Sequence, residues 1–177
     1  GVILGTDGRP DAPGYGARTD TFVIVVADVP AEGPMIVTLI AVPRDLFIHV
    51  PCEPGYPPGE TPMNRVNAAW YRGGFDCVRE TVKLNFGLDV DQPVALLDMA
   101  DVTDFVDTMG GIALTPEQDY GDECWDEPMF WAQDETYQMS GRETLCYVRG
   151  RNSYGGDIDR GRRAIEIMKA AAAQWPA

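Results

Sequence analysis

Two short runs of aliphatic, mostly β-branched residues constrain the fold of this chain more than any other feature. They cover residues 21–27 (TFVIVVA) and 35–42 (MIVTLIAV), and the turn sequence AEGP lies between them at 31–34. Runs of this length and composition predict strands, and their near-continuous apolarity predicts that both faces of each strand are covered. The longest uninterrupted apolar stretch is six residues, at 22–27, which is too short to span a membrane.

The rest of the chain alternates between strand and helix patterns. Strands are predicted at 1–4, 46–50, 93–98 and 112–115, and helices at 64–71, 76–86, 101–109 and 159–175. The sequence SGRE at 140–143 has the capping-box pattern that opens a further helix. Residues 116–138 are acidic, aromatic and aperiodic, so we expect a long excursion there. Strands interleaved with helices predict a layered α/β domain, and the length of 177 residues suits one domain over 1–177.

The charge balance argues against large polyanions and for a small, concentrated anion. The formal net charge is −14, from 28 acidic and 14 basic residues. The overall electrostatic field of such a chain disfavours binding to nucleic acid or to an anionic membrane. Twelve of the 14 basic residues are arginine, and five of these lie between positions 149 and 163, whereas residues 117–135 hold eight acids and no base. Arginine binds phosphate or carboxylate with a planar two-pronged fork.

The cysteines and the single histidine exclude several classes of site. Cys52, Cys77, Cys124 and Cys146 have no C-x-x-C spacing, which excludes zinc-ribbon and thioredoxin-like motifs. With one histidine, His49, mechanisms that need two are excluded. Four scattered cysteines suit two disulfides in an oxidising compartment. Of the three possible pairings we favour 52 with 77 and 124 with 146, because each closes a loop onto a predicted helix; the alternative is four buried thiols.

Three short polar segments lie beside predicted strands, where open α/β sheets usually build their sites. They are DGR at 7–9, RTDT at 18–21 and PRD at 43–45. Asp7 and Asp20 are suited to share a divalent cation such as Mg²⁺, with Arg18 and Arg44 holding phosphate oxygens. The alternative is a simple salt bridge, Asp20 with Arg44 or Asp7 with its neighbour at position 9, without any ligand.

A fourth polar segment, at 149–163, gathers arginines around a glycine-rich loop. Arg149 and Arg151 would point the same way in an extended chain, and Arg160 and Arg163 would share a face of the following helix, with Arg160 in its first turn. A helix N-terminus is a natural anion site. We therefore expect a phosphate or pyrophosphate site here, with a self-paired structural helix as the alternative.

Taken in order, these segments resemble the LytR-CpsA-Psr family over essentially the whole chain. The matching sequences are GTDGR at 5–9, RTDT at 18–21, VPRD at 42–45, NRVNAA at 64–69 with GG at 73–74, MGGI at 109–112, YVRGR at 147–151 and DIDRGRR at 157–163. The resemblance implies an α/β/α sandwich with a central mixed β-sheet flanked by helices and an apolar groove for a prenyl chain. It also implies an extracytoplasmic phosphotransferase that moves a glycopolymer, such as teichoic acid, capsule or arabinogalactan, from a polyprenyl-pyrophosphate carrier to peptidoglycan.

The resemblance implies roles residue by residue. Asp7 and Asp20 match the family's metal ligands, with Mg²⁺ or Mn²⁺ as cofactor. Asp20, Arg44 and Asp157 are the implied catalytic residues, and either aspartate could take the proton from the acceptor. The implied pyrophosphate-binding residues are Arg18, Arg44, Arg65, Arg149, Arg151, Arg160 and Arg163. Two features depart from the family: Ala164 replaces its usual glutamine, and the acidic segment 117–135 and the four cysteines are not typical.

The implied partners are a polyprenyl-pyrophosphate-linked glycan and a peptidoglycan acceptor, and not nucleic acid. The implied location is extracytoplasmic and membrane-associated, through an anchor that family members usually carry before this domain, and a monomer is expected. Two other classes stay open. One is a hydrolase that cleaves the same pyrophosphate with water, and the other is a non-catalytic module that binds an anionic lipid.

Overall fold

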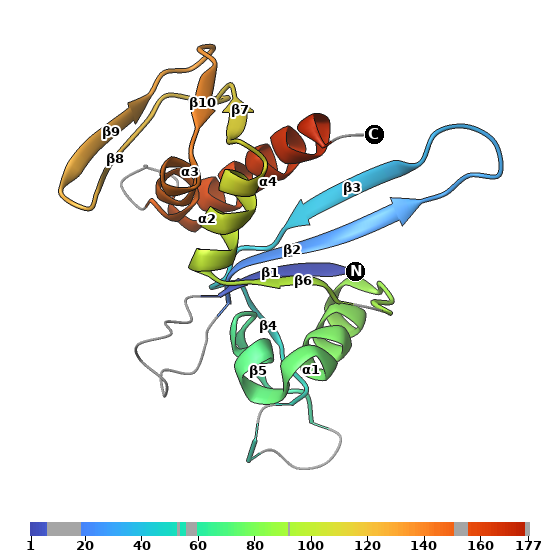
Figure 1. Cartoon of the computed structure of the whole chain (residues 1–177). Coiled ribbons are helices and arrows are strands. Elements are labelled where there is room, and N and C mark those ends of the chain that lie inside the picture. Colours follow the sequence, from blue (N-terminus) through green and yellow to red (C-terminus); the bar gives the residue numbers. More distant parts are fainter. Residues whose placement is uncertain (7–18, 53, 56–59, 92, 151–155, 176–177) are drawn as a thin grey trace. The chain divides into compact units, whose positions relative to one another are not determined.

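The computed structural model divides into two compact units, unit 1 (Gly1–Asp98) and unit 2 (Met99–Ala177). The structure describes residues 1–6, 19–52, 54–55, 60–91, 93–150 and 156–175 (Figure 1). Each unit has its own core of buried apolar side chains. The two units are therefore described one at a time.

Unit 1 is built on a four-stranded mixed sheet with the strand order β3-β2-β1-β6. Its strands are β1 (Val2–Thr6), β2 (Thr19–Asp28), β3 (Ile36–Ala41) and β6 (Pro93–Leu97). β1 runs antiparallel to β2 and parallel to β6, and β2 and β3 form an antiparallel hairpin. The register pairs Val2 with Ile24 and Leu4 with Phe22, so these four buried side chains share one face.

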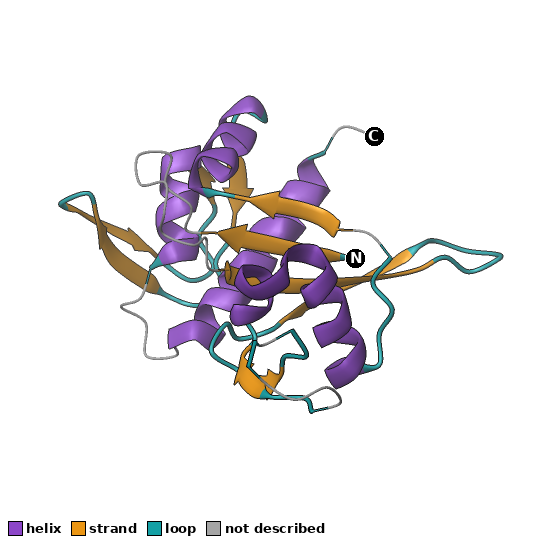
Figure 2. Ribbon diagram, turned by 90° about the horizontal axis from the view of Figure 1, so that it is seen from below, coloured by secondary structure: helices purple, strands orange, loops and turns teal. Residues whose placement is uncertain are grey.

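Helix α1 (Ala68–Phe86) and the short strands β4 (Phe47–His49) and β5 (Met63–Arg65) cover that face. Figure 2 shows the kinked helix in front of the strands of the sheet. The kink lies at Gly73 and Gly74, whose backbone angles are not helical. This break agrees with the two separate helices predicted at 64–71 and 76–86, although the first begins only at Ala68 because residues 63–65 pair with β4.

Unit 2 combines three helices with short strands. They are α2 (Met99–Thr108), β7 (Ile112–Leu114), β8 (Tyr120–Cys124), β9 (Glu127–Trp131), β10 (Tyr137–Met139), α3 (Gly141–Arg149) and α4 (Gly156–Gln174). Strands β8 and β9 form one antiparallel ribbon, and β7 pairs with β10. The predicted capping box is present at Ser140 and Glu143. The side-chain amide of Gln174 bonds the backbone of Ala113 and so fastens the end of α4 to β7.

The predicted α/β class with a central mixed sheet is confirmed, while two local predictions are wrong. β3 is not covered on both faces, because Ile36, Val37 and Ile40 are 57%, 49% and 38% exposed on an edge strand. The excursion predicted at 116–138 is not irregular, because most of it forms the β8–β9 hairpin and β10. In the hairpin, Tyr120 and Trp131 pair across the strands and stack in parallel.

Both units contain a disulfide. Cys52 is bonded to Cys77 in unit 1 and Cys124 to Cys146 in unit 2, which is the pairing that the sequence favours. The first joins the proline-rich loop after β4 to α1, and the second joins β8 to α3. Within the described part of the chain, no helix has the length and apolar character needed to cross a membrane.

Candidate functional site

The P-R-D turn of unit 1 is held beside the segment 64–67 by backbone hydrogen bonds. The amide of Leu46 donates to the carbonyl of Pro43 and closes the turn, with a nitrogen–oxygen distance of 2.9 Å. The amide of Asn67 then donates to the carbonyl of Arg44 at 3.2 Å, and that of Val66 to the carbonyl of Leu46 at 2.9 Å. Two of the sequence motifs, about twenty positions apart, are thereby fixed next to each other.

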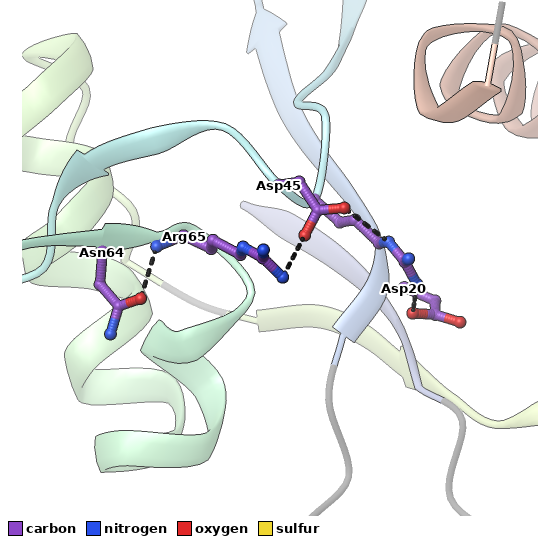
Figure 3. Close-up of polar contacts among 5 residues, drawn as sticks. Asp20, Asp45, Asn64 and Arg65 are labelled. Carbon is purple, nitrogen blue, oxygen red and sulfur yellow. Dashed lines mark hydrogen bonds and ion pairs between the residues drawn. The ribbon is translucent and has the colours of Figure 1, made fainter.

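Four charged side chains form a row in this region, which we call the Arg44 cluster: Asp20, Arg44, Asp45 and Arg65. Nη1 of Arg44 lies 2.5 Å from Oδ1 of Asp20, and its Nε lies 3.4 Å from Oδ2 of Asp45. Nη1 of Arg65 lies 3.2 Å from Oδ1 of Asp45 (Figure 3). The backbone amide of Arg65 also donates to the side chain of Asn64. Negative and positive groups therefore alternate along the row.

The Arg44 cluster is open to solvent at the end where Arg65 lies. The side chain of Arg44 is 21% exposed and that of Arg65 is 60% exposed. The two carboxylates balance the charge of the two guanidinium groups. The salt bridge between Asp20 and Arg44, which the sequence left open as an alternative, is present. The planar guanidinium fork of arginine can donate to two oxygens of a phosphate as it does to the two oxygens of a carboxylate, so this row is chemically suited to exchange one acceptor for the other.

Asp20 has suitable donor chemistry for a divalent cation. A hard carboxylate oxygen is what Mg²⁺ and Mn²⁺ prefer, and Mg²⁺ commonly takes only one or two carboxylates together with substrate phosphates. In the described residues, no group of three or more His, Cys, Asp and Glu side chains is placed to hold a metal ion. The other predicted ligand, Asp7, and the predicted phosphate ligand Arg18 lie outside the described residues.

The arginine-rich segment of unit 2 is more helical than predicted. Arg149 is the last residue of α3 rather than part of an extended strand, because the capping box starts a helix that continues to the glycine at 150. α4 begins at Gly156, so Arg160 lies one turn inside that helix and not in its first turn. Arg151 lies outside the described residues, and of Asp157 only the backbone, within α4, is described.

Arg160 and Arg163 share the buried face of α4, as their spacing predicts. They are 5% and 0% exposed, whereas Arg149 is exposed. Burial lowers the pKa of the Arg163 guanidinium from its usual value, although the neighbouring tyrosines act against this effect. Among the predicted arginines of unit 2 whose side chains the structure describes, Arg149 is therefore exposed, whereas Arg160 and Arg163 are buried.

A buried hydrogen-bond network connects α3 to α4. The hydroxyl of Tyr147 donates to Oε2 of Glu166 at 2.5 Å, and Arg162 pairs with the other oxygen of the same carboxylate. Burial, together with this bond to Glu166, raises the pKa of Tyr147 well above its usual value. The network holds the helix that carries Arg149 against the helix that carries Arg160.

Sequence reasoning did not assign Asp45, Tyr147 or Glu166 to the site. Asp45 belongs to the P-R-D segment but carries no role implied by the resemblance. Glu166 follows Arg162 by four positions, which is the spacing of side chains that meet on a helix. Tyr147 precedes Arg149 by two positions, and only the packing of α3 against α4 reveals its contact with Glu166.

The chain is similar to curated proteins whose names refer to cell-wall biosynthesis and teichoic acid transfer. It is 32% identical to the probable cell wall biosynthesis protein LcpB of Corynebacterium glutamicum over 153 residues, which is 86% of this chain and 33% of that protein. It is 27% identical to the polyisoprenyl-teichoic acid–peptidoglycan teichoic acid transferase TagV of Bacillus subtilis over 163 residues, 89% of this chain and 39% of TagV. The chain thus spans between a third and a half of the curated relatives it matches.

Solved structures share the fold. The crystal structure of B. subtilis TagV matches with a TM-score of 0.71 at 22% identity, covering 98% of this chain and 63% of TagV. The structure of TagT with bound octaprenyl pyrophosphate lipid matches with a TM-score of 0.69 at 21% identity, covering 98% of this chain and 62% of TagT. The model of the LytR_cpsA_psr family matches residues 2–176. This chain therefore belongs to the LytR_cpsA_psr family.

Proposed function

We propose that this chain is the catalytic part of an extracytoplasmic phosphotransferase that moves a glycopolymer from a polyprenyl-pyrophosphate carrier to peptidoglycan. The observation that carries the proposal is the family match over residues 2–176. Two relatives support it: TagV is named as a teichoic acid transferase, and TagT has been solved with a bound octaprenyl pyrophosphate lipid. Two disulfides suit an oxidising location outside the cytoplasm.

In this proposal, arginines neutralise the phosphate groups. Arg44 and Arg65 do so in unit 1, and Arg149 and Arg160 do so in unit 2. Arg18 and Arg151 have the same proposed role, on sequence grounds alone. The support is chemical: in a chain with a net charge of −14, arginines in the Arg44 cluster and at the end of α3 offer delocalised, permanently charged forks for phosphate oxygens.

The proposed reaction is an in-line displacement at phosphorus. An acceptor hydroxyl oxygen forms a bond to the phosphorus that bears the glycan, and the bond from that phosphorus to the bridging oxygen breaks. Polyprenyl phosphate leaves with the electron pair, and the hydroxyl proton passes to a carboxylate, either Asp20 or Asp157. Positioning and neutralisation of charge supply most of the catalysis in such reactions.

A divalent cation, Mg²⁺ or Mn²⁺, is proposed on Asp20 and Asp7. When bound, it would supply Lewis-acid neutralisation of the pyrophosphate oxygens. The carboxylate of Asp20 would then be shared between the cation and Arg44. A shared carboxylate would keep the guanidinium of Arg44 oriented and leave its other N–H groups able to donate to a phosphate.

The apolar surface of β3 supports a lipid-linked substrate. Ile36, Val37 and Ile40 of this edge strand are all more than a third exposed, as is Met35 just before it, and Ile36 and Ile40 lie on the same face of the strand. Exposed apolar groups that are contiguous, rather than scattered, are typical of surfaces that bind apolar partners. We propose that this surface contacts the prenyl chain.

The proposal is tested by incubating the chain with a synthetic polyprenyl-pyrophosphoryl disaccharide and a peptidoglycan oligomer, with Mg²⁺ or with a chelator. Mass spectrometry should find the oligomer heavier by one glycosyl phosphate, together with free polyprenyl phosphate. Cleaved donor with an unmodified oligomer would instead identify a hydrolase. Bound but intact donor under all conditions would identify a non-catalytic lipid-binding module. Either result would overturn the transferase proposal.

A further inference from the structure

The side chain of Arg163 donates hydrogen bonds to backbone carbonyls at the end of helix α3. Its Nε donates to the carbonyl of Tyr147 and its Nη2 donates to the carbonyl of Gly150, both at 2.7 Å. The last carbonyls of a helix have no donor within that helix, and a cation near them is electrostatically favourable. Arg163, on α4, therefore supplies donors that α3 lacks, to carbonyls two residues before and one residue after Arg149.

The other side of Gly150 is closed by the β8 strand. A Cβ atom at this position would lie 1.3 Å from the hydroxyl oxygen of Tyr120 and 2.1 Å from Oδ2 of Asp122. The same hydroxyl donates to Asp122 at 2.5 Å. The R-G-R segment therefore requires glycine at its centre, because the hydroxyl and the carboxylate occupy the space of a side chain.

Arg163 and Tyr120 also contact each other directly. The guanidinium carbon of Arg163 lies 4.0 Å from the centre of the Tyr120 ring, and the ring of Tyr147 meets that of Tyr120 edge to face. Stacking on an aromatic ring fixes the plane of a guanidinium group and hence the direction of its donors. Tyr120, Asp122 and Arg163 thus hold Gly150 from two sides, and we call these three residues the Gly150 clamp.

We propose that Arg163 is a positioning residue, which, with Tyr120 and Asp122, holds Arg149 at a fixed place relative to Arg160 and does not itself touch the pyrophosphate. This assignment replaces the pyrophosphate-binding role that the family resemblance implies for Arg163. It rests on the proposed function, in which Arg149 and Arg160 bind the pyrophosphate. It also gives a role to the acidic β8–β9 segment, since two of the three clamp residues come from β8.

The test is a double-mutant cycle on the affinity for inorganic pyrophosphate, measured by titration calorimetry. Arg163→Lys keeps the charge but cannot span two carbonyls while stacking on a ring. If Arg163 acts through Arg149, Arg163→Lys weakens binding about tenfold in the wild-type chain and by less than about twofold in an Arg149→Ala background. Effects that multiply in the double variant would mean an independent contact and would overturn the inference, as would unchanged affinity in Arg163→Lys.

Two further variants keep the test decisive if Arg163→Lys folds poorly. Tyr120→Phe removes only the hydroxyl that lies against Gly150, and it should weaken binding by about threefold in the wild-type chain but not in Arg149→Ala. Val106→Ala, in the core of the same unit with a side chain that is 1% exposed, should lower the melting temperature and leave the affinity unchanged. If Val106→Ala weakens binding as much as Tyr120→Phe does, the loss is one of stability and the inference is wrong.

The same titrations separate this inference from the proposed function. Unchanged affinity in both Arg149→Ala and Arg160→Ala would remove pyrophosphate binding by unit 2, and with it both proposals. A different result would remove only the positioning role of Arg163. In that case, Arg149→Ala and Arg160→Ala both weaken binding, and Arg163→Lys weakens binding by the same factor in the wild-type chain and in Arg149→Ala. The proposed function would then stand.

Discussion

Arg44 donates to Asp20 across 24 residues of sequence, with 2.5 Å between Nη1 and Oδ1. The two side chains belong to different sequence motifs and are 21% and 28% exposed. A salt bridge with this much exposure contributes only about 0–1 kcal/mol to stability. We therefore expect this pair to act through the orientation and charge of Arg44 rather than through the folding of unit 1.

Removing either partner of this pair should reduce turnover without unfolding the chain. Arg44→Ala should lower the rate of transfer by about 10²–10³-fold, the usual effect of losing one donor to a developing anion. Asp20→Ala should lower the rate as well, because it removes the carboxylate that orients Arg44 and that is proposed to hold the cation. The free energy of unfolding should change by about 1 kcal/mol or less. The transfer assay and urea unfolding measure the two effects separately.

Arg79→Ala is the matched control for this prediction. Arg79 pairs with Asp76 on the surface of α1, with 3.4 Å between the charged atoms and half of its side chain exposed. Its replacement should leave both turnover and stability unchanged. Full transfer activity in Arg44→Ala would remove the Arg44 cluster from the mechanism.

The stability of the chain should fall above about pH 10 because two buried tyrosines stay protonated in the folded state. Burial and hydrogen bonds to Asp122 and Glu166 raise the pKa of Tyr120 and Tyr147 above the ordinary value of 10.0. Above pH 10 the unfolded chain loses protons that the folded chain retains. Each tyrosine thus contributes stability that is complete below pH 10 and declines by about 1.4 kcal/mol per pH unit above it.

Urea unfolding between pH 8 and pH 11 measures this decline. Tyr147→Phe should make the slope above pH 10 shallower, because one of the two groups is removed. The lowered pKa of Arg163 acts in the opposite direction, because the folded chain releases this proton at a lower pH than the unfolded chain does. A slope that is the same in Tyr147→Phe and in the wild-type chain would contradict the assignment.

The sequence predicted elements whose signal is local and missed those that depend on distant contacts. The capping box at Ser140 located α3, and the apolar runs located β2 and β3. The β8–β9 hairpin was missed because its two-residue turn, Trp125 and Asp126, has positive φ angles at both positions without the asparagine or glycine that signals such turns.

The candidate site was predictable as a list of residue types and less so as an arrangement. Proximity of Asp20 and Arg44, and a common face for Arg160 and Arg163, followed from motif order and helix spacing. The enclosure of Arg163 did not, since burial depends on the ring of Tyr120, more than forty residues earlier. Arginines that bind a ligand and arginines that hold a backbone look alike in sequence.

Each disulfide should contribute about 3–4 kcal/mol to stability. The bonds close loops with sequence separations of 25 and 22 residues, and loop-closure entropy of the unfolded chain gives this magnitude. The double variant Cys52→Ser/Cys77→Ser tests the first bond, and Cys124→Ser/Cys146→Ser tests the second. Thiol titration of the unreduced, unfolded chain should find no reactive cysteine, and four reactive thiols before reduction would contradict the pairing.

Gly141→Ala should destabilise unit 2, although it replaces glycine by alanine within a helix. In an exposed helix interior this change is favourable by about 1 kcal/mol. Here a Cβ atom would lie 2.3 Å from the carbonyl oxygen of Thr103, so α2 and α3 would have to move apart, at a cost of about 1–3 kcal/mol. Gly121→Ala is the matched control, because its nearest neighbour, at 3.2 Å, is the ring of the exposed Phe130, which is free to move. Urea unfolding should therefore give a clear loss for Gly141→Ala and little change for Gly121→Ala, and a gain in stability for Gly141→Ala would contradict the close contact between α2 and α3.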